Sequence, residues 1–175
     1  MVGASHDPRK LGYIILDNLI RGGFAGAVYP VNLNAARVRA SRISDLSDMT
    51  RAALADALPP AASVANPVDV LGDARSARYA RALETIGRDD GVDATIVLLT
   101  PQAMTDAEQT ARSIAHFARA GTKPVIASFM GGDAVAAGRA LLDDAHVPVF
   151  AYPERAVRAM AALRAYRRYL DGLDQ

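Results

Sequence analysis

The chain has 175 residues, of which 51% are hydrophobic and 22% charged, and a formal net charge of +1. A charge this close to zero gives no general attraction to nucleic acid or to a membrane surface, and the lack of cysteine excludes disulfides, thiolate catalysis and cysteine metal sites. No apolar run approaches the roughly 20 residues that a membrane-spanning helix needs, and the N-terminus lacks the pattern of a secretory signal, so we expect a cytoplasmic protein without nucleic-acid or membrane partners.

The first predicted elements are a strand end, a turn of small residues, a helix and a second strand. Apolar residues recur at a spacing of four over residues 10–22, which indicates one buried helix face. The sequence AVYPV at 27–31 reads as a short strand near a sheet edge. From Asn32 to Ser44 no period is clear, and we therefore predict a join between two segments near residues 37–45.

The rest of the chain alternates helices and strands. The run DATIVLLT at 93–100 is continuously apolar, which is typical of a strand buried on both faces. Alternation of strands with helices of about a dozen residues predicts an α/β fold with a mostly parallel sheet. The predicted strands cover 93–100, 123–129 and 147–151, and the predicted helices cover about 45–58, 75–87, 133–145 and 153–170, with a further helix whose buried stripe is Ala107, Thr110, Ala111, Ile114, Phe117 and Ala118.

The turn GASHDPRKLG is the first candidate for ligand chemistry. Backbone N–H groups at the start of a helix favour a bound anion. Ser5 could donate a hydroxyl hydrogen bond, and Lys10 could supply a positive charge. Gly3 has no side chain, so a phosphate could approach the backbone there. The string fits neither the Gly-x-Gly-x-x-Gly fingerprint nor the phosphate-binding P-loop. From these residues alone, a turn without a ligand is the favoured alternative.

Other charged clusters predict no catalytic residue and no metal site. The adjacent pairs Asp89–Asp90 and Asp143–Asp144 do not converge on one point, and metal-ligand spacing is absent. The arginines of the last predicted helix are interpreted as a solvated helix face. They are Arg155, Arg158, Arg164, Arg167 and Arg168.

The string VGASHDPRKLGYIILDNLIRGGFAGAVYPVN resembles the start of the coenzyme A-binding domain of ADP-forming acyl-CoA synthetases, relatives of succinyl-CoA ligase. The likeness includes the glycine turn, the lysine-glycine pair, the asparagine-leucine of the helix and the PVN at the second strand. Since only the start of that domain is present, the resemblance implies a weak or partial coenzyme A site. The residues it places at the coenzyme are Gly3, Ser5, Lys10, Gly12, Pro30 and Asn32.

The strings LPPAASVANPVDVLGDA, VLLTPQAMTD, KPVIASFMGG and VPVFAYPERAVRAMAAL resemble the flavodoxin-like ligase domain that lies further along such synthetases. In that family the domain directs a helix N-terminus at a phosphohistidine, and the resemblance places Thr100, Gln102 and Thr105 around this helix start. Asn66 and Asp69 belong to another family motif, and the alternative is that they only fix their own turn. Likewise, the glycines of FMGG are alternatively turn residues alone.

The two resemblances predict the domain organisation. Residues 1–43 would be a partial, Rossmann-like coenzyme A-binding segment, and residues 44–175 a flavodoxin-like, three-layer ligase domain that lacks its first strand. One option is that the N-terminal piece supplies that strand. Because the two segments are not neighbours in the family, the sequence reads as an internally deleted synthetase, which a gene remnant or faulty gene assembly would produce.

The histidines fit this interpretation. The family's active histidine lies in a Ser-His-Thr-Gly-Ala-type turn, a context that His6, His116 and His146 all lack, and no ATP-grasp segment is recognisable. The resemblance therefore implies a coenzyme A-binding fragment or component of a synthetase, inactive alone, that needs a partner chain carrying the phosphohistidine and the ATP-grasp domain. The alternatives are a non-catalytic coenzyme A or phosphate-binding module and a non-functional remnant, and a homo-oligomer also stays open.

Overall fold

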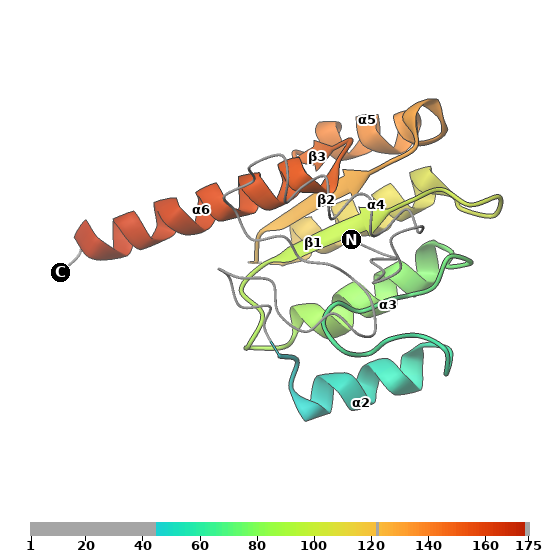
Figure 1. The fold of residues 1–175 in the computed structure, drawn as a ribbon, viewed down its shortest axis with the longest axis horizontal. Helices are drawn as coiled ribbons and strands as arrows, with labels where there is room; N and C mark the ends of the chain where they lie inside the picture. Colours follow the sequence, from blue (N-terminus) through green and yellow to red (C-terminus); the bar gives the residue numbers. More distant parts are fainter. Residues whose placement is uncertain (1–44, 122, 174–175) are drawn as a thin grey trace, which may run out of the picture.

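The computed structural model describes residues 45–121 and 123–173. Within them the chain alternates between helices and strands from β1 onwards (Figure 1). The helices and strands are α2 (Asp48–Ala57), α3 (Ser76–Gly87), β1 (Thr95–Leu99), α4 (Ala107–Ala120), β2 (Val125–Phe129), the 3₁₀ helix η1 (Gly132–Val135), α5 (Ala136–Asp144), β3 (Val149–Phe150) and α6 (Pro153–Leu173).

The three strands form one parallel sheet in the order β1-β2-β3. The register pairs Thr95 with Val125 and Leu99 with Phe129, and it pairs Ala127 with Val149. Each parallel connection runs through a helix, α4 between β1 and β2 and α5 between β2 and β3. This is the α/β architecture with a parallel sheet that the alternation predicted.

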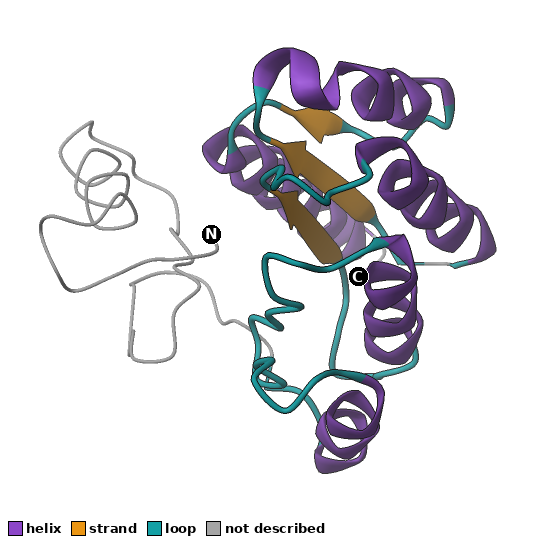
Figure 2. Cartoon of the chain, turned by 90° about the vertical axis from the view of Figure 1, so that its right-hand side faces the viewer, coloured by secondary structure: helices purple, strands orange, loops and turns teal. Residues whose placement is uncertain are grey.

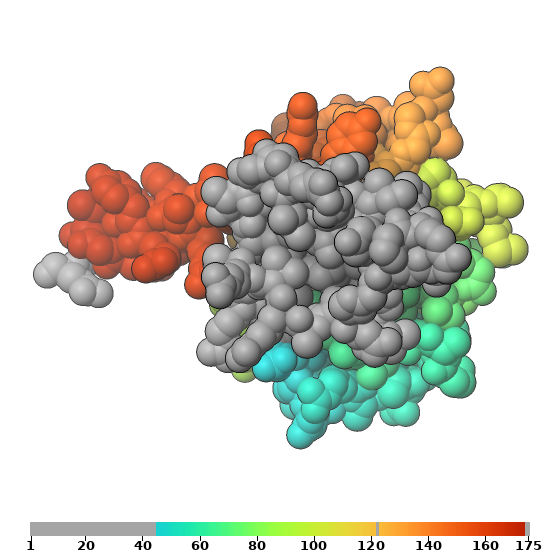
Figure 3. Space-filling view, in the orientation of Figure 1, coloured from blue at the N-terminus to red at the C-terminus, as the bar shows by residue number. Residues whose placement is uncertain are grey.

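Helices cover both faces of the sheet. Figure 2 shows α4 on one face and α6 on the other, and α6 contacts all three strands. Helix α5 packs against α4, α3 packs against α4 on its other side, and α2 packs against α3. The space-filling view shows the second half of α6 extending beyond the rest of the molecule (Figure 3).

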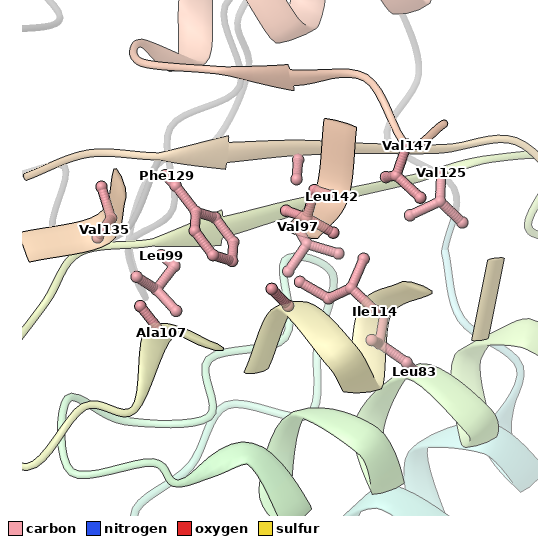
Figure 4. Close-up of a cluster of buried hydrophobic side chains, with 12 residues drawn as sticks. Leu83, Val97, Leu99, Ala107, Ile114, Val125, Phe129, Val135, Leu142 and Val147 are labelled. Atoms are coloured by element: carbon pink, nitrogen blue, oxygen red, sulfur yellow. The ribbon is translucent and has the colours of Figure 1, made fainter. Parts of the chain in front are cut away.

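The main core lies between the sheet and helices α4 and α5 (Figure 4). Successive strand residues alternate between the two faces of a sheet. Leu99 and Phe129 are paired in the register, so they lie on the same face, and both belong to this core. Ile114 of α4 and Leu142 of α5 close it, and all four side chains are 0% exposed. A second cluster around Leu46, Leu54, Leu58, Ala82 and Val92 joins α2 to α3.

The prediction that 93–100 is buried on both faces is wrong in part. In β1 only Val97 and Leu99 are buried, whereas Ile96 and Leu98 are half-buried. The strand buried along its whole length is β2, because it lies between two neighbours and under helices on both faces.

Two predicted helices differ in detail from those observed. The predicted helix at 133–145 begins as the 3₁₀ turn η1 before α5 continues it, and such turns are common at helix N-termini. The predicted stripe of α4 is buried at Ala107, Thr110, Ala111 and Ile114, but Phe117 is only half-buried. Pro153 opens α6 as predicted, since the first turn of a helix tolerates proline.

A buried carboxylate connects α2 to the loop before β1. Asp89 is 6% exposed. Its side chain accepts N–H bonds from Ser47 at 2.9 Å and Gly91 at 2.9 Å. The Thr50 hydroxyl and then these two N–H groups hold the pKa of Asp89 well below its ordinary value. The Lys123 ammonium donates to the Asp89 carbonyl oxygen at 2.6 Å, so this residue also connects to the start of β2.

The coenzyme-binding part of the prediction, residues 1–43, lies outside the described residues, as does the option that it supplies a strand. None of the helices in the described ranges is long and apolar enough to cross a membrane.

Candidate functional site

The candidate site is the edge of the sheet where the parallel strands end. Because all three strands run in the same direction, the segments that follow them begin at one edge. The turn at 100–106 follows β1 and the turn at 130–132 follows β2, and both lie on the right of Figure 1. Ligands of open α/β sheets commonly bind at this edge.

Close packing holds the two turns together. Gly131 has φ 142°, and a Cβ at this position would lie 2.5 Å from Pro101 Cγ. Gly132 also has a positive φ, 56°. The FMGG glycines thus meet a conformational requirement of the turn. The loop before α3 also reaches this edge, since a Cβ on Gly72 would lie 3.7 Å from Gln102 Cγ.

Two of the three residues predicted at the helix start, Gln102 and Thr105, are joined in one turn. The Gln102 N–H donates to the Thr105 hydroxyl oxygen at 2.8 Å, and the Thr105 N–H donates to the Gln102 carbonyl oxygen at 3.0 Å. Thr100, directly after β1, is exposed. Because the Thr105 oxygen is the acceptor in its contact with Gln102, its hydroxyl retains a hydrogen to donate. The structure therefore joins Gln102 to Thr105, and the role of Thr100, Gln102 and Thr105 at a phosphoryl group stays a prediction.

The sequence interpretation missed Asp106, the N-cap of α4. Its carboxylate accepts the Gln109 N–H at 2.9 Å. The signal was available, because Asp followed three residues later by Gln is the spacing of a capping box. A carboxylate at this point already provides the negative charge that the helix N-terminus favours. Any anion bound at this helix start would consequently lie next to the negative charge of Asp106.

The NPVD loop fixes its own conformation through Asp69. The Asp69 carboxylate accepts the Leu71 N–H at 2.9 Å, and the backbone of Asp69 bridges to Ser63 in both directions. Asp69 also lies near Tyr79, whose pKa is raised by burial and then by this carboxylate. The structural alternative predicted for Asp69 is thus observed.

The remaining candidates do not join this edge. His116 and His146 are both exposed, on α4 and just before β3. Within residues 45–121 and 123–173, no group of three or more histidine, aspartate and glutamate side chains could hold a metal ion. The six predicted coenzyme contacts lie outside the described residues: Gly3, Ser5, Lys10, Gly12, Pro30 and Asn32.

Comparison with known proteins gives a consistent result. The Ligase-CoA domain family matches residues 21–173. The chain is 36% identical over 115 residues to the ADP-forming acetate–CoA ligase I of Archaeoglobus fulgidus, covering 66% of this chain and 16% of that protein. It is 33% identical over 138 residues to the subunit alpha of ADP-forming acetate–CoA ligase II of Pyrococcus furiosus, covering 77% of this chain and 30% of that subunit.

A solved structure shows the same fold. The apo form of the dinucleotide-forming acetyl-coenzyme A synthetase 1 of Ca. Korarchaeum cryptofilum superposes with a TM-score of 0.67 and 31% identity, over 72% of this chain and 28% of that one. The chain thus spans less than a third of the relatives it matches. The family match begins at residue 21, inside the segment predicted to bind coenzyme A. The boundary near residue 43 and the internal deletion stay predictions.

Proposed function

Because this chain belongs to the Ligase-CoA domain family, we propose that it is a component of an ADP-forming acyl-CoA synthetase. The reaction converts an acid, coenzyme A and ATP into an acyl-CoA, ADP and phosphate through a phosphohistidine that another chain supplies. The family match over residues 21–173 is the observation that carries this proposal. The likeness to acetate–CoA ligases supports the reaction class.

The proposed role of the carboxyl-terminal sheet edge is to hold the phosphoryl group. Thr100 and Thr105 would donate hydroxyl hydrogen bonds, and Gln102 would donate from its side-chain amide. Such donors stabilise negative charge on the transferring oxygens most strongly when the turn is already fixed. The two hydrogen bonds between Gln102 and Thr105 and the contact of Pro101 with Gly131 support a fixed turn here.

Coenzyme A is the proposed cofactor, held in part by the N-terminal segment through Gly3, Ser5, Lys10, Gly12, Pro30 and Asn32. With only the start of a coenzyme-binding domain available, its affinity would lie near the millimolar range, about 4 kcal/mol of binding free energy. The nucleotide would bind to a separate ATP-grasp chain. One relative is a subunit alpha, which supports a partner chain. The proposed location is the cytoplasm.

The sheet-edge role is tested with a purified chain that carries the histidine and ATP-grasp domains, labelled on its histidine with ³²P. Adding the present chain with acetate and coenzyme A should accelerate loss of the acid-labile label. Thr105→Val, which keeps the shape but removes the hydroxyl, should slow that loss about 10- to 100-fold. Ser113→Ala removes a hydroxyl that donates to the Gln109 carbonyl oxygen within α4, and it should leave the rate unchanged.

The alternatives give different results. A binding module would take up coenzyme A or phosphate without affecting the label. A non-functional remnant would do neither. If wild type and Thr105→Val lose the label at equal rates, the sheet edge does not hold the phosphoryl group, even though the label is lost.

A further inference from the structure

One edge of the sheet is open in the part of the chain that the structure describes. β1 is an outermost strand, and within that part it pairs with β2 alone (Figure 1). The Thr95 N–H donates to the Pro124 carbonyl oxygen at 2.9 Å. The Leu99 carbonyl oxygen accepts the Met130 N–H, also at 2.9 Å. The backbone groups at the two ends of β1 thus point toward β2.

The backbone groups of Ile96 and Leu98 point the other way, because their direction alternates along a strand. No hydrogen bond between described residues takes them up. Both side chains are half-buried, whereas Ile126, which pairs with Ile96 in the register, is 1% exposed. Backbone groups of native folds are rarely left without a partner, and an open edge is a template for a further strand. The edge of β1 therefore fits one more strand.

We propose that residues 27–31 of this chain, AVYPV, pair with β1 as that strand and run parallel to it. In the register that we assign, Val28 lies opposite Ile96 and Pro30 lies opposite Leu98. The Tyr29 N–H then donates to the Ile96 carbonyl oxygen, and the Tyr29 carbonyl oxygen accepts the Leu98 N–H.

The ends of the segment satisfy the two remaining groups of the edge. The Ala27 carbonyl oxygen accepts the Ile96 N–H, and the Val31 N–H donates to the Leu98 carbonyl oxygen. Every open backbone group of Ile96 and Leu98 has a partner in this register. The residue after the strand, Asn32, would lie opposite Thr100 at the carboxyl edge of the sheet. A role of Asn32 in coenzyme binding there rests on the proposed function, whereas the strand does not.

The proline selects both the position and the register. Pro30 has no N–H, and proline within a sheet is confined to outermost strands and strand ends. Opposite Leu98, its nitrogen points away from β1, where no donor is needed. A shift by one residue would turn this nitrogen toward β1 and leave a carbonyl oxygen there without its donor. The segment thus fits the outermost place in the sheet and no inner one.

The attachment point of the segment also fits. A Cβ at Gly91 would lie 3.6 Å from the Asp45 carbonyl oxygen, so residue 45 lies just ahead of β1. Residues 32–44 can span about 40 Å, more than the length of a five-residue strand, about 17 Å. The path from 27–31 to β1 runs through α3, which packs beside α4. It would have the same hand as the path from β1 to β2 through α4, as the rule of right-handed crossovers requires.

Introduced cysteines test the strand in the full chain, which has no cysteine of its own. Val28→Cys with Ile96→Cys puts the two thiols on one face of neighbouring strands, within reach of a disulfide. Ala27→Cys with Ile96→Cys is the matched control, because adjacent strand residues face opposite sides. Val28→Cys with Leu98→Cys pairs directly only in an antiparallel strand. Under mild oxidation, the first pair should form an intramolecular disulfide at least about tenfold faster than the other two, as mass spectrometry measures.

Amide hydrogen exchange by NMR tests the hydrogen bonds. The Ile96 and Leu98 N–H groups should exchange at least about tenfold more slowly in wild type than in Tyr29→Pro, which lacks the N–H that pairs with β1. Val28→Pro is the matched control and should keep this protection, since its nitrogen points away from β1. The Ala127 N–H, which is bonded across β2 and β3, should stay protected in both variants and reports that the sheet is folded.

Other results would overturn the proposal. Fast exchange at Ile96 and Leu98 in wild type would leave the edge unpaired. Protection that survives Tyr29→Pro, or that Val28→Pro removes equally, would assign the edge to another segment. Preferential formation of the disulfide between positions 28 and 98 would make the strand antiparallel, and disulfides found only between molecules would assign the edge to a second copy.

The crosslinks decide alone if Tyr29→Pro unfolds the sheet. Neither experiment involves phosphate or coenzyme A. Failure of the strand therefore refutes this inference and leaves the proposed function standing, and failure of label transfer does the reverse.

Discussion

At Gly138, α5 lies close against the first residue of α4, and Gly138→Ala tests the packing next to the candidate site. A Cβ there would lie 2.7 Å from the Ala107 carbonyl oxygen and 3.0 Å from its carbonyl carbon. Both are backbone atoms, so no side-chain rotation relieves the overlap. Ala107 is the first residue of α4, directly after its cap and the 100–105 turn. A shift of α4 at this point would therefore move the turn as well.

The expected magnitude follows from two opposing terms. Alanine is favoured over glycine inside a helix by about 1 kcal/mol. Overpacking costs about 1 to 3 kcal/mol, and contact with fixed backbone indicates the upper part of that range. The net loss should be about 1 to 2 kcal/mol, which lowers Tm by roughly 3 to 8 °C.

Calorimetry of the full chain measures this change, and Gly172→Ala is the matched control. Gly172 also lies in a helix, but a Cβ there meets nothing within 4 Å. Its substitution should leave Tm unchanged or raise it slightly. If Gly138→Ala is as stable as Gly172→Ala, the close approach of α5 to α4 is wrong.

Phe129→Ala removes a fully buried ring from the main core and should cost about 3 to 5 kcal/mol in chemical unfolding; a loss below about 1 kcal/mol would contradict the core assignment. The pKa of Asp89 is depressed in the folded chain, so its contribution to stability is present above the ordinary aspartate pKa of about 3.9 and is lost as pH falls. Asp89→Asn should thus lower Tm at pH 7, and its Tm should decrease less on acidification than that of wild type. If the plots of Tm against pH are parallel for the two proteins, this carboxylate does not have that role. By itself the full chain should form neither acyl-CoA nor acid-labile phosphohistidine with ATP, and titration calorimetry should give a coenzyme A Kd near millimolar; a submicromolar Kd would show a complete coenzyme pocket.

The described fold could be predicted largely because its pattern is local. Strands 125–129 and 149–150 are short apolar runs, and α4 has a strong apolar period. What the pattern could not supply was the difference between β1 and β2. Both are mostly apolar, and only their neighbours in the sheet decide that Ile126 is buried while Ile96 is half-buried.

The candidate site shows the same limit. The resemblance predicts Thr100, Gln102 and Thr105 at a helix start, and the structure joins Gln102 to Thr105 by two hydrogen bonds. The sequence predicts no role for the adjacent pair Asp89–Asp90, since nothing local indicates that Ser47, 42 residues away, donates to the Asp89 carboxylate. The arginines of the last helix are all exposed, as the prediction of a solvated helix face requires.

The central claim is that this chain completes an ADP-forming acyl-CoA synthetase whose phosphohistidine lies elsewhere. The most direct measurement is acetyl-CoA formation from acetate, coenzyme A and ATP by the chain that carries the histidine and ATP-grasp domains, with and without an equimolar amount of this chain. The account predicts turnover only in the mixture, with ADP formed in equal amount to acetyl-CoA. Turnover that is the same without this chain, or none in the mixture, would contradict it.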